Sequence, residues 1–303
     1  MQSIRWENGK AVIPKIEFYI NNTCNLTCNN CNRFNNHKFN GWQNFHDYEE
    51  DLKKWSEYIT IEKLVIMGGE PLLNPSLIAW IEGLNKIFNK HVQILSNGLL
   101  LHKNKKLYHM LHRHNKHYNY IGISWHNPNH KQLLLEQLHS FMENPVCVSG
   151  NIDSNLKSGD QITFVDDNKV KILVWVQDEF YQAAVQKNYN GNFTLHNNDP
   201  TLAHSQCGFA QNKNYHLIKG KLYKCGPVAL FPEFHEQNNF DLPQDDIDLL
   251  YAYKPLSVDE FQTKGKDFLN SIDDVLPQCK FCPVNLKPEL IYPEVKGKSN
   301  QNK

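Results

Sequence analysis

The chain has 303 residues, 40% of them apolar, so it is long enough to bury a sizeable hydrophobic core. Its 32 basic residues balance its 32 acidic residues, which argues against a protein that binds nucleic acid or an anionic membrane through its overall charge. The sequence contains no signal peptide and no long apolar span, so we expect a cytoplasmic protein without a membrane anchor, whose cysteines are thiols rather than disulfides.

Three closely spaced cysteines follow the first predicted strand, residues 16–20. This cysteine triplet consists of Cys24, Cys28 and Cys31, and its short spacing places the sulfurs on one loop at the carboxyl end of the strand, where α/β proteins place their chemistry. A four-iron cluster held by only three thiolates keeps one iron open for a substrate or cofactor. The spacing alone leaves a zinc knot or a few buried thiols as alternatives.

The first half of the chain alternates between short apolar runs and helical patterns. The runs at residues 64–67, 92–95 and 120–125 predict strands that are covered on both faces. Apolar stripes predict the helices between them, which carry Leu52, Trp55 and Ile59, then Leu77, Trp80, Leu84 and Phe88 after Asn74 and Pro75, then Leu134, Leu138 and Phe141. Repeated strand–helix units with right-handed crossovers predict the α/β class, in the form of a partial barrel with five or six strands.

The predicted strands end in residues that suit a binding site. A Gly-Gly-Glu-Pro motif, made of Gly68, Gly69, Glu70 and Pro71, follows residues 64–67, and Ser96 and Asn97 follow residues 92–95. Ser124 lies at the end of the next strand, and His126 follows it, where it is a candidate to bind substrate or relay a proton. The alternatives are an ordinary turn at Ser96 and a hydrogen-bonded histidine at a strand end.

The cysteine triplet and the Gly-Gly-Glu-Pro motif together resemble the radical S-adenosylmethionine (SAM) enzymes. The resemblance implies a [4Fe-4S] cluster held by the triplet, whose open iron takes the amino and carboxylate groups of SAM, with the first three motif residues lining the methionine amino group. It also implies that Ser96 and Asn97 approach the ribose and that Ser124 occupies a similar polar position. Reductive cleavage of SAM then gives a 5'-deoxyadenosyl radical that removes hydrogen from a substrate. The family often has an aromatic residue where this chain has Asn30.

An asparagine-rich stretch at residues 188–198 predicts the boundary between two domains. We expect a first domain at residues 1–190, a second at residues 191–295, and a disordered tail at residues 296–303. Cys147 lies in a short apolar stretch, which favours a small buried core residue.

Three further elements are predicted around that boundary. Residues 162–165 and 170–176 favour strands, and residues 180–186 favour a short helix. Residues 215–218 and 221–224 favour a β-hairpin in the second domain.

Four more cysteines in the second half form a cysteine quartet, namely Cys207, Cys225, Cys279 and Cys282. Four thiolates can close a site around a structural zinc ion. The segment also resembles the twitch domain, a shortened SPASM domain, and its cysteine spacing is similar to that of the butirosin-pathway aminoglycoside dehydrogenase. That resemblance implies a hairpin with helices around one auxiliary [4Fe-4S] cluster. A full SPASM domain has more cysteines after the equivalent of Cys282, and this chain has none, so a second auxiliary cluster is not expected.

These resemblances imply an oxidoreductase or maturase that uses radical SAM chemistry. The leading expectation is a dehydrogenation in which the auxiliary cluster accepts an electron, and a flavodoxin or ferredoxin is the expected electron donor. The main alternative is cross-linking or epimerisation of a peptide, although the 23 residues before Cys24 are too few for a leader-binding domain. A more distant alternative is a non-catalytic iron–sulfur or zinc module. We expect a small-molecule or peptide substrate and no nucleic acid partner.

Overall fold

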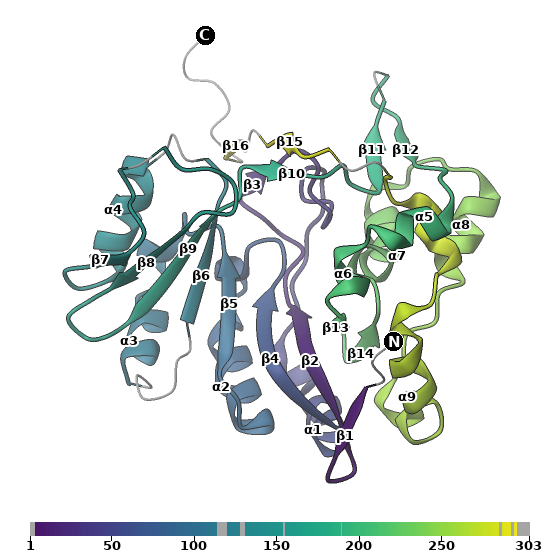
Figure 1. Ribbon diagram of the computed structural model, residues 1–303, viewed down its shortest axis with the longest axis horizontal. Helices are drawn as coiled ribbons and strands as arrows, with labels where there is room; N and C mark the ends of the chain where they lie inside the picture. The colour runs from purple at the N-terminus through teal and green to yellow at the C-terminus, as the bar shows by residue number, and fades with distance from the viewer. Residues whose placement is uncertain are drawn as a thin grey trace.

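One large sheet organises the chain, and its strands come from both halves of the sequence (Figure 1). The computed structural model describes residues 4–113, 120–127, 131–153, 155–188, 190–284, 287–291 and 294–295. The strand order is β14-β13-β2-β4-β5-β6-β9-β8-β7, and β1 pairs with β2. The strands are β1 (Arg5–Glu7), β2 (Lys10–Tyr19), β4 (Ile59–Met67), β5 (Val92–Ser96), β6 (Tyr120–Trp125), β7 (Val146–Ser149), β8 (Gln161–Val165), β9 (Lys171–Val176), β13 (Asn214–Ile218) and β14 (Lys221–Tyr223).

The central strands of this sheet run parallel. Parallel pairing joins β13 to β2 and continues through β4, β5 and β6 to β9. Antiparallel strands lie outside this group, with β14 next to β13 and the pair β8 and β7 next to β9. The predicted α/β class with a partial barrel is confirmed. Over the described ranges the sheet stays open, because β14 and β7 form its two edges.

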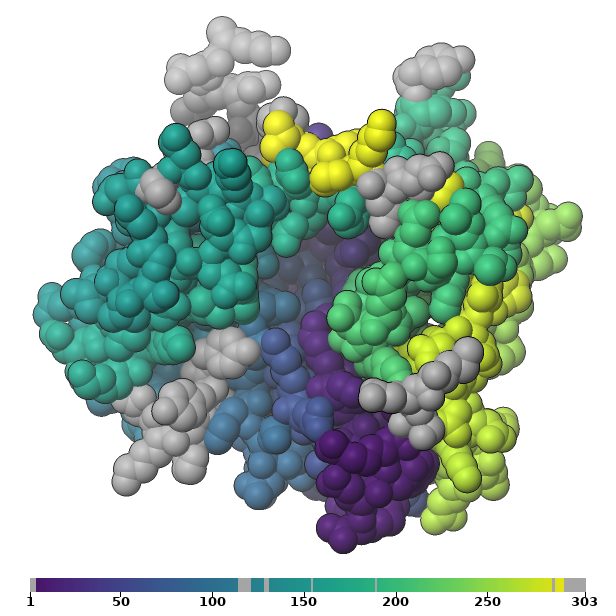
Figure 2. All heavy atoms as spheres, viewed as in Figure 1, coloured from purple at the N-terminus to yellow at the C-terminus, as the bar shows by residue number. Residues whose placement is uncertain are grey.

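Helices cover one face of the sheet. The helices α1 (Glu49–Tyr58), α2 (Leu77–Phe88), α3 (Lys105–Arg113) and α4 (Lys131–Phe141) share one hydrophobic core with the strands. The buried residues of α2 recur every three or four positions, as Leu77, Trp80, Ile81 and Leu84. Side chains alternate between the faces of a strand, so Ile16 and Phe18 of β2 meet these helices while Glu17 points to the other face. Figure 2 shows that other side as a hollow, with purple and blue residues at its back between teal and green walls.

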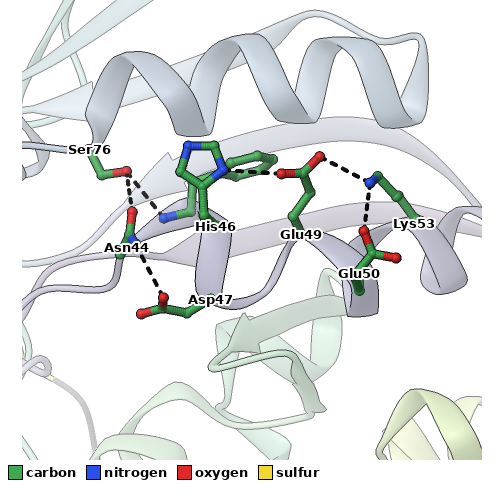
Figure 3. A network of polar contacts seen from close by, with 8 residues as sticks. Asn44, His46, Asp47, Glu49, Glu50, Lys53 and Ser76 are labelled. Carbon is green, nitrogen blue, oxygen red and sulfur yellow. Dashed lines mark hydrogen bonds and ion pairs between the residues drawn. The ribbon is translucent and has the colours of Figure 1, made fainter.

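Polar contacts organise the start of α1 (Figure 3). The hydroxyl of Ser76, which lies just before α2, donates to Oδ1 of Asn44 at 3.2 Å. Glu49 accepts contacts from Nδ1 of His46 and Nζ of Lys53, both at 3.1 Å. Acidic residues in the first turn also suit the positive end of the helix dipole. Exposed pairs of this kind contribute little to stability, so the buried side chains of α1 are what fix it on the sheet.

The second half adds helices and short strand pairs around the hairpin. The predicted hairpin is confirmed as β13 and β14, which turn at Lys219 and Gly220 with φ angles of 50° and 73°. Its first strand pairs with β2, so hydrogen bonds of one sheet join the two halves of the chain. The remaining helices are α5 (Pro200–Ser205), α6 (Gly208–Gln211), α7 (Gly226–Asn238), α8 (Gln244–Tyr251) and α9 (Phe261–Asn270). The two-stranded pairs are β10 (Glu179–Phe180) with β15 (Glu289–Leu290), β11 (Val185–Lys187) with β12 (Phe193–Leu195), and β16 (Glu294–Val295) with β3 (Leu26–Thr27).

Short 3-10 helices complete the described structure, as η1 (Phe45–Asp47), η2 (Pro71–Leu73), η3 (Leu101–Lys103), η6 (Val258–Glu260), η7 (Ser271–Asp273) and η8 (Pro277–Phe281). None of the helices in the described ranges is both long and apolar enough to cross a membrane. The predicted tail at residues 296–303 lies outside the described residues. The predicted boundary after residue 190 stays a prediction.

Three local predictions are wrong. Residues 180–186 do not form a helix, because both ends of this stretch pair as strands with β15 and β12. The helix expected to carry Ile59 ends at Tyr58, because Ile59 is the first residue of β4 and pairs with Ala11. Cys147 is exposed rather than buried, because β7 is an edge strand whose four residues all face solvent.

Candidate active site

A cavity of about 160 Å³ lies where the central parallel strands end. We call it the strand-end cavity. The cysteine triplet and both glycines of the Gly-Gly-Glu-Pro motif line it, together with Ser96, Asn97, Ser124 and His126. The structure thus brings together residues from four separate places in the sequence, because parallel strands end at the same edge of a sheet.

The loop that carries the triplet contacts a segment much later in the chain, at residues 289–295. Leu26 and Cys28 pack with Ile291 in a small apolar core, and β3 between the first two cysteines pairs with β16. Asn30 has a φ of 59°, a left-handed conformation that asparagine tolerates, and its amide donates to Glu289 at 2.7 Å. At position 30, where the family often has an aromatic residue, this chain instead has an asparagine that contacts the segment around Glu289.

The two glycines are required by a close approach of two backbone segments. The N–H of Gly69 donates to the carbonyl of Asn21 at 2.5 Å, and the N–H of Glu70 donates to the carbonyl of Thr23 at 2.8 Å. A Cβ atom on Gly68 would lie 2.4 Å from the carbonyl oxygen of Asn21, and one on Gly69 would lie 2.4 Å from that of Thr23. Real Cβ atoms do not approach this closely, so only glycine allows the motif to pack against the start of the cysteine loop.

The carboxyl group of Glu70 is buried behind the residues that line the strand-end cavity and supports their positions. It is fully buried and accepts hydrogen bonds from the Leu72 N–H at 3.0 Å, the Ser96 hydroxyl at 2.8 Å and the Asn97 N–H at 2.8 Å. Burial raises the pKa of this carboxyl group to about 7, against the lowering effect of these donors. Glu70 and Pro71 are absent from the residues that line the cavity, so within the motif the two glycines form the lining surface.

Asn97 connects the end of β5 to the cysteine loop. Its Nδ2 donates to Oδ1 of Asn25 at 2.8 Å and lies 3.9 Å from the sulfur of Cys24. The N–H of Leu26 also points at that sulfur, at 3.5 Å. Hydrogen bonds to cysteine sulfur adjust the electronic properties of a cluster that such a thiolate ligates.

His126 also lines the strand-end cavity, and its tautomer is defined. Its Nδ1 lies 2.9 Å from the carbonyl oxygen of Gln177, which can only accept, so Nδ1 carries the proton and Nε2 is an acceptor. Burial lowers the pKa of the imidazole, which favours the neutral ring. The ring packs edge-on against Phe180 with centroids 5.4 Å apart. The arrangement leaves Nε2 of His126 as a hydrogen-bond acceptor.

Comparison with known families identifies the first half of the chain. Residues 18–145 match the family model described as Radical SAM superfamily. This segment belongs to the radical SAM superfamily. It covers less than half of the chain, and it contains the cysteine triplet, the Gly-Gly-Glu-Pro motif and the strand-end residues that line the cavity. Membership implies an enzyme that uses SAM and a [4Fe-4S] cluster. A search of curated proteins found none that matches the chain.

The sequence interpretation missed two buried polar residues of the radical SAM segment. Asn21 donates to the carbonyls of Thr23 at 2.9 Å and Glu70 at 2.7 Å, so its amide ties the two motifs together. Arg33 is 5% exposed, lines the strand-end cavity and pairs with Glu17 of β2 at 2.9 Å. In the sequence, Asn21 and Arg33 are recognisable only as polar residues near the triplet. Polar residues are common at strand ends, so this position did not predict a role for them.

The cysteine quartet lies beyond the radical SAM segment and lines a separate cavity of about 40 Å³. Cys207 and Cys225 precede α6 and α7, while Cys279 and Cys282 belong to or follow η8. Burial raises the pKa of the Cys225 thiol well above its usual range, and the other three thiols raise it further. Crowded thiols of this kind suit a bound cation, because metal binding replaces their protons. Within the described ranges, no three Cys, His, Asp or Glu side chains form a group that could hold a single metal ion.

Proposed function

We propose that the cysteine triplet holds a [4Fe-4S] cluster with one open iron, that the strand-end cavity binds SAM, and that the enzyme dehydrogenates its substrate. One observation carries the proposal. The triplet, the motif glycines and the polar residues at the ends of β5 and β6 of a radical SAM segment line one cavity. An isolated zinc knot gives no reason for the other groups to converge on the thiols.

The residues present fit these two groups. Three thiols on one loop supply a soft donor set that leaves a four-iron cluster incompletely ligated. Gly68 and Gly69 carry no Cβ atom, which lets the motif pack against Asn21 and Thr23 and brings its backbone to the wall of the strand-end cavity. When bound, the cluster and SAM supply a carbon-centred radical able to remove a hydrogen atom from the substrate.

The chain's own residues position the reactants and accept a proton. The network from Glu70 to Ser96 and Asn97 fixes one wall, and the packing of Ile291 against the cysteine loop shields that loop from water. Dehydrogenation of an alcohol removes one hydrogen atom, then a proton and an electron. Nε2 of His126 is the proposed proton acceptor, because its Nδ1–H is already engaged by the Gln177 carbonyl.

We assign the electron-accepting role to an auxiliary [4Fe-4S] cluster on the cysteine quartet, in a twitch-like second domain. Four cysteines give complete ligation, which suits electron acceptance better than direct binding of substrate. A flavodoxin or ferredoxin in a reducing cytoplasm is the proposed donor for the first cluster.

Modification of a peptide is the second candidate, and one observation favours it. A groove of about 480 Å³ adjoins the strand-end cavity, because Asn32 and Phe180 line both. Its wall includes the amide side chains of Asn30, Gln177 and Gln182. Their nitrogen atoms donate within the protein, and their oxygen atoms can accept from the backbone N–H groups of a peptide. A substrate larger than a single sugar can lie in this groove.

The test uses anaerobically reconstituted protein with SAM and dithionite. We expect release of methionine and 5'-deoxyadenosine, and absence of both products rejects radical SAM activity. Carbon-deuterated polyols and aminocyclitols then test the reaction type, because a dehydrogenase transfers deuterium from its substrate into 5'-deoxyadenosine. Transfer from a deuterated peptide, with none from the polyols, favours the second candidate.

A further inference from the structure

A buried charge cluster lies on the inner face of the sheet. It consists of Lys15, Glu17, Arg33 and His216, and Glu17 is at its centre. The central carboxylate lies 2.7 Å from Nζ of Lys15, 2.9 Å from Nη2 of Arg33 and 3.2 Å from Nδ1 of His216. Glu17 and Arg33 each expose only 6% of their side chains, and His216 exposes none. Water therefore screens the charges at the centre of the cluster only weakly.

The cluster carries more positive than negative charge. His216 is neutral, because burial lowers the pKa of its imidazole. Burial opposes ionisation of Glu17, but its partners hold its carboxyl pKa well below the ordinary value, so it is a carboxylate. Lys15 and Arg33 supply two positive charges against this one negative charge. The Nε and Nη1 atoms of Arg33 are buried without a hydrogen-bond partner among the described residues, so part of its charge stays uncompensated.

The charge of Arg33 has a fixed place beside the cysteine triplet. Arg33 follows Cys31 by two positions, so the Cα atoms of the two residues lie no more than about 8 Å apart. Both residues also line the strand-end cavity. The guanidinium lies over the ring of Tyr19 at 5.9 Å, and its ion pair with Glu17 ties it to β2. These contacts hold the positive charge at the foot of the triplet loop.

The same guanidinium contacts the segments that carry two members of the cysteine quartet. It lies over the ring of Phe209 at 5.2 Å, and Phe209 follows Cys207 by two positions in α6. Its Nη1 atom fills the space beside Gly226, where a Cβ atom would overlap it. Gly226 is the first residue of α7 and directly follows Cys225. Arg33 therefore lies between the loop of the triplet and the helix starts that carry Cys207 and Cys225.

We propose that Arg33 is a shared positive charge that raises the reduction potential of the cluster at each of the two cysteine sites. This assignment rests on the proposed function, which supplies both clusters. The reduced form of an iron–sulfur cluster carries one more negative charge than the oxidised form, so a nearby buried positive charge stabilises it. A raised potential suits the quartet as the acceptor of one electron from the substrate. At the triplet, it favours uptake of one electron from the flavodoxin or ferredoxin. A guanidinium suits this role, because it stays charged when buried.

The test is a redox titration of the anaerobically reconstituted full-length protein without SAM, followed by electron paramagnetic resonance. It gives one midpoint potential for each cluster, and the signals lost in Cys24→Ala and in Cys279→Ala assign the two sites. Arg33→Met removes a positive charge and should lower both potentials. Glu17→Gln removes a negative charge with little change of shape and should raise both.

The size of these shifts follows from Coulomb's law. Removal of a unit charge at roughly 10 Å, in a medium of effective dielectric constant about 20, changes a one-electron equilibrium roughly tenfold. We therefore expect the ratio of reduced to oxidised cluster at a given potential to change roughly tenfold in each variant, a shift of about 59 mV for one electron.

The opposite signs separate an electrostatic role from a structural one, because damage to the packing gives no reason for the two partners of one ion pair to shift the potentials in opposite directions. Arg33→Lys keeps the charge and should keep both potentials close to those of the wild type. Arg113→Met is the matched control, because Arg113 lies at the exposed end of α3 and donates to the carbonyl of His109. It should leave both potentials unchanged. If Arg33→Met fails to fold, the rise in Glu17→Gln decides the test.

Three results overturn the assignment. These are unchanged potentials in Arg33→Met and Glu17→Gln, shifts of the same sign in both variants, or a shift at one cluster only, which rejects a shared charge. A wild type that shows both cluster signals and cleaves SAM, with any of these results in the variants, rejects only the role of Arg33 and leaves the proposed function standing. A wild type without the signal of the quartet cluster rejects the assignment together with the proposed electron acceptor.

Discussion

Gly69→Ala tests how tightly the motif must pack against the cysteine loop. The new methyl group would lie 2.4 Å from the carbonyl oxygen and 2.7 Å from the carbonyl carbon of Thr23, so the two backbone segments have to separate by about 1 Å to reach ordinary contact. That separation breaks the Gly69 to Asn21 and Glu70 to Thr23 hydrogen bonds, of 2.5 Å and 2.8 Å. Each contributes about 1 kcal/mol, so the ordered loop loses about 2 kcal/mol.

If the cysteine loop must become ordered again when SAM binds, the affinity of Gly69→Ala for SAM falls by roughly 30-fold. Equilibrium binding of SAM to the anaerobically reconstituted protein measures the change. Gly208→Ala is the matched control, because a Cβ atom there meets nothing within 4 Å. An affinity of Gly69→Ala within about twofold of the control would refute the argument from close approach.

Three further predictions concern the buried carboxylate and the two sets of cysteines. Burial raises the pKa of Glu70 from the ordinary 4.5 to about 7, so the folded state holds this proton longer than the unfolded state and stability falls as the pH rises through that interval. The free energy of unfolding, measured with denaturant at pH 5 and pH 8, should differ less between the two pH values in Glu70→Gln than in the wild type. An equal difference in the two proteins would count against the raised pKa of Glu70. Replacing any triplet cysteine with alanine should abolish SAM cleavage. The control variant Cys147→Ala changes an exposed cysteine and should cleave SAM normally. Cleavage by a triplet variant would contradict the assignment of the triplet as cluster ligands. Cys279→Ala should lower iron content and product formation more than SAM cleavage, and unchanged iron with normal turnover rejects an auxiliary cluster.

The sequence predicted the elements whose pattern is local. The strand at residues 120–125 agrees with β6 at both ends, and the hairpin of β13 and β14 agrees within one residue at each end. Apolar runs and helical stripes depend on the identity of near neighbours, so a single sequence is enough to find them. The convergence of the triplet, the motif glycines and the strand ends also follows from the order of parallel strands.

Contacts between distant segments were not predictable in the same way. The stretch 180–186 has a helical pattern but pairs with strands that include β15, more than a hundred positions later in the chain. The pairing of β13 with β2 likewise joins segments about two hundred residues apart, and no local pattern records it. The burial of the Glu70 carboxyl group depends on donors from Ser96 at the end of β5 and from Asn97 after it, so composition gave no sign of it.

The central claim is that the cysteine triplet holds a four-iron cluster whose open iron binds SAM. Electron paramagnetic resonance of the dithionite-reduced, reconstituted protein, recorded with and without SAM, tests it most directly. We predict the signal of a reduced [4Fe-4S] cluster that changes when SAM is added and that is lost when a triplet cysteine is replaced by alanine. A protein with no such signal, or with one that neither SAM nor the triplet substitutions alter, would contradict the account.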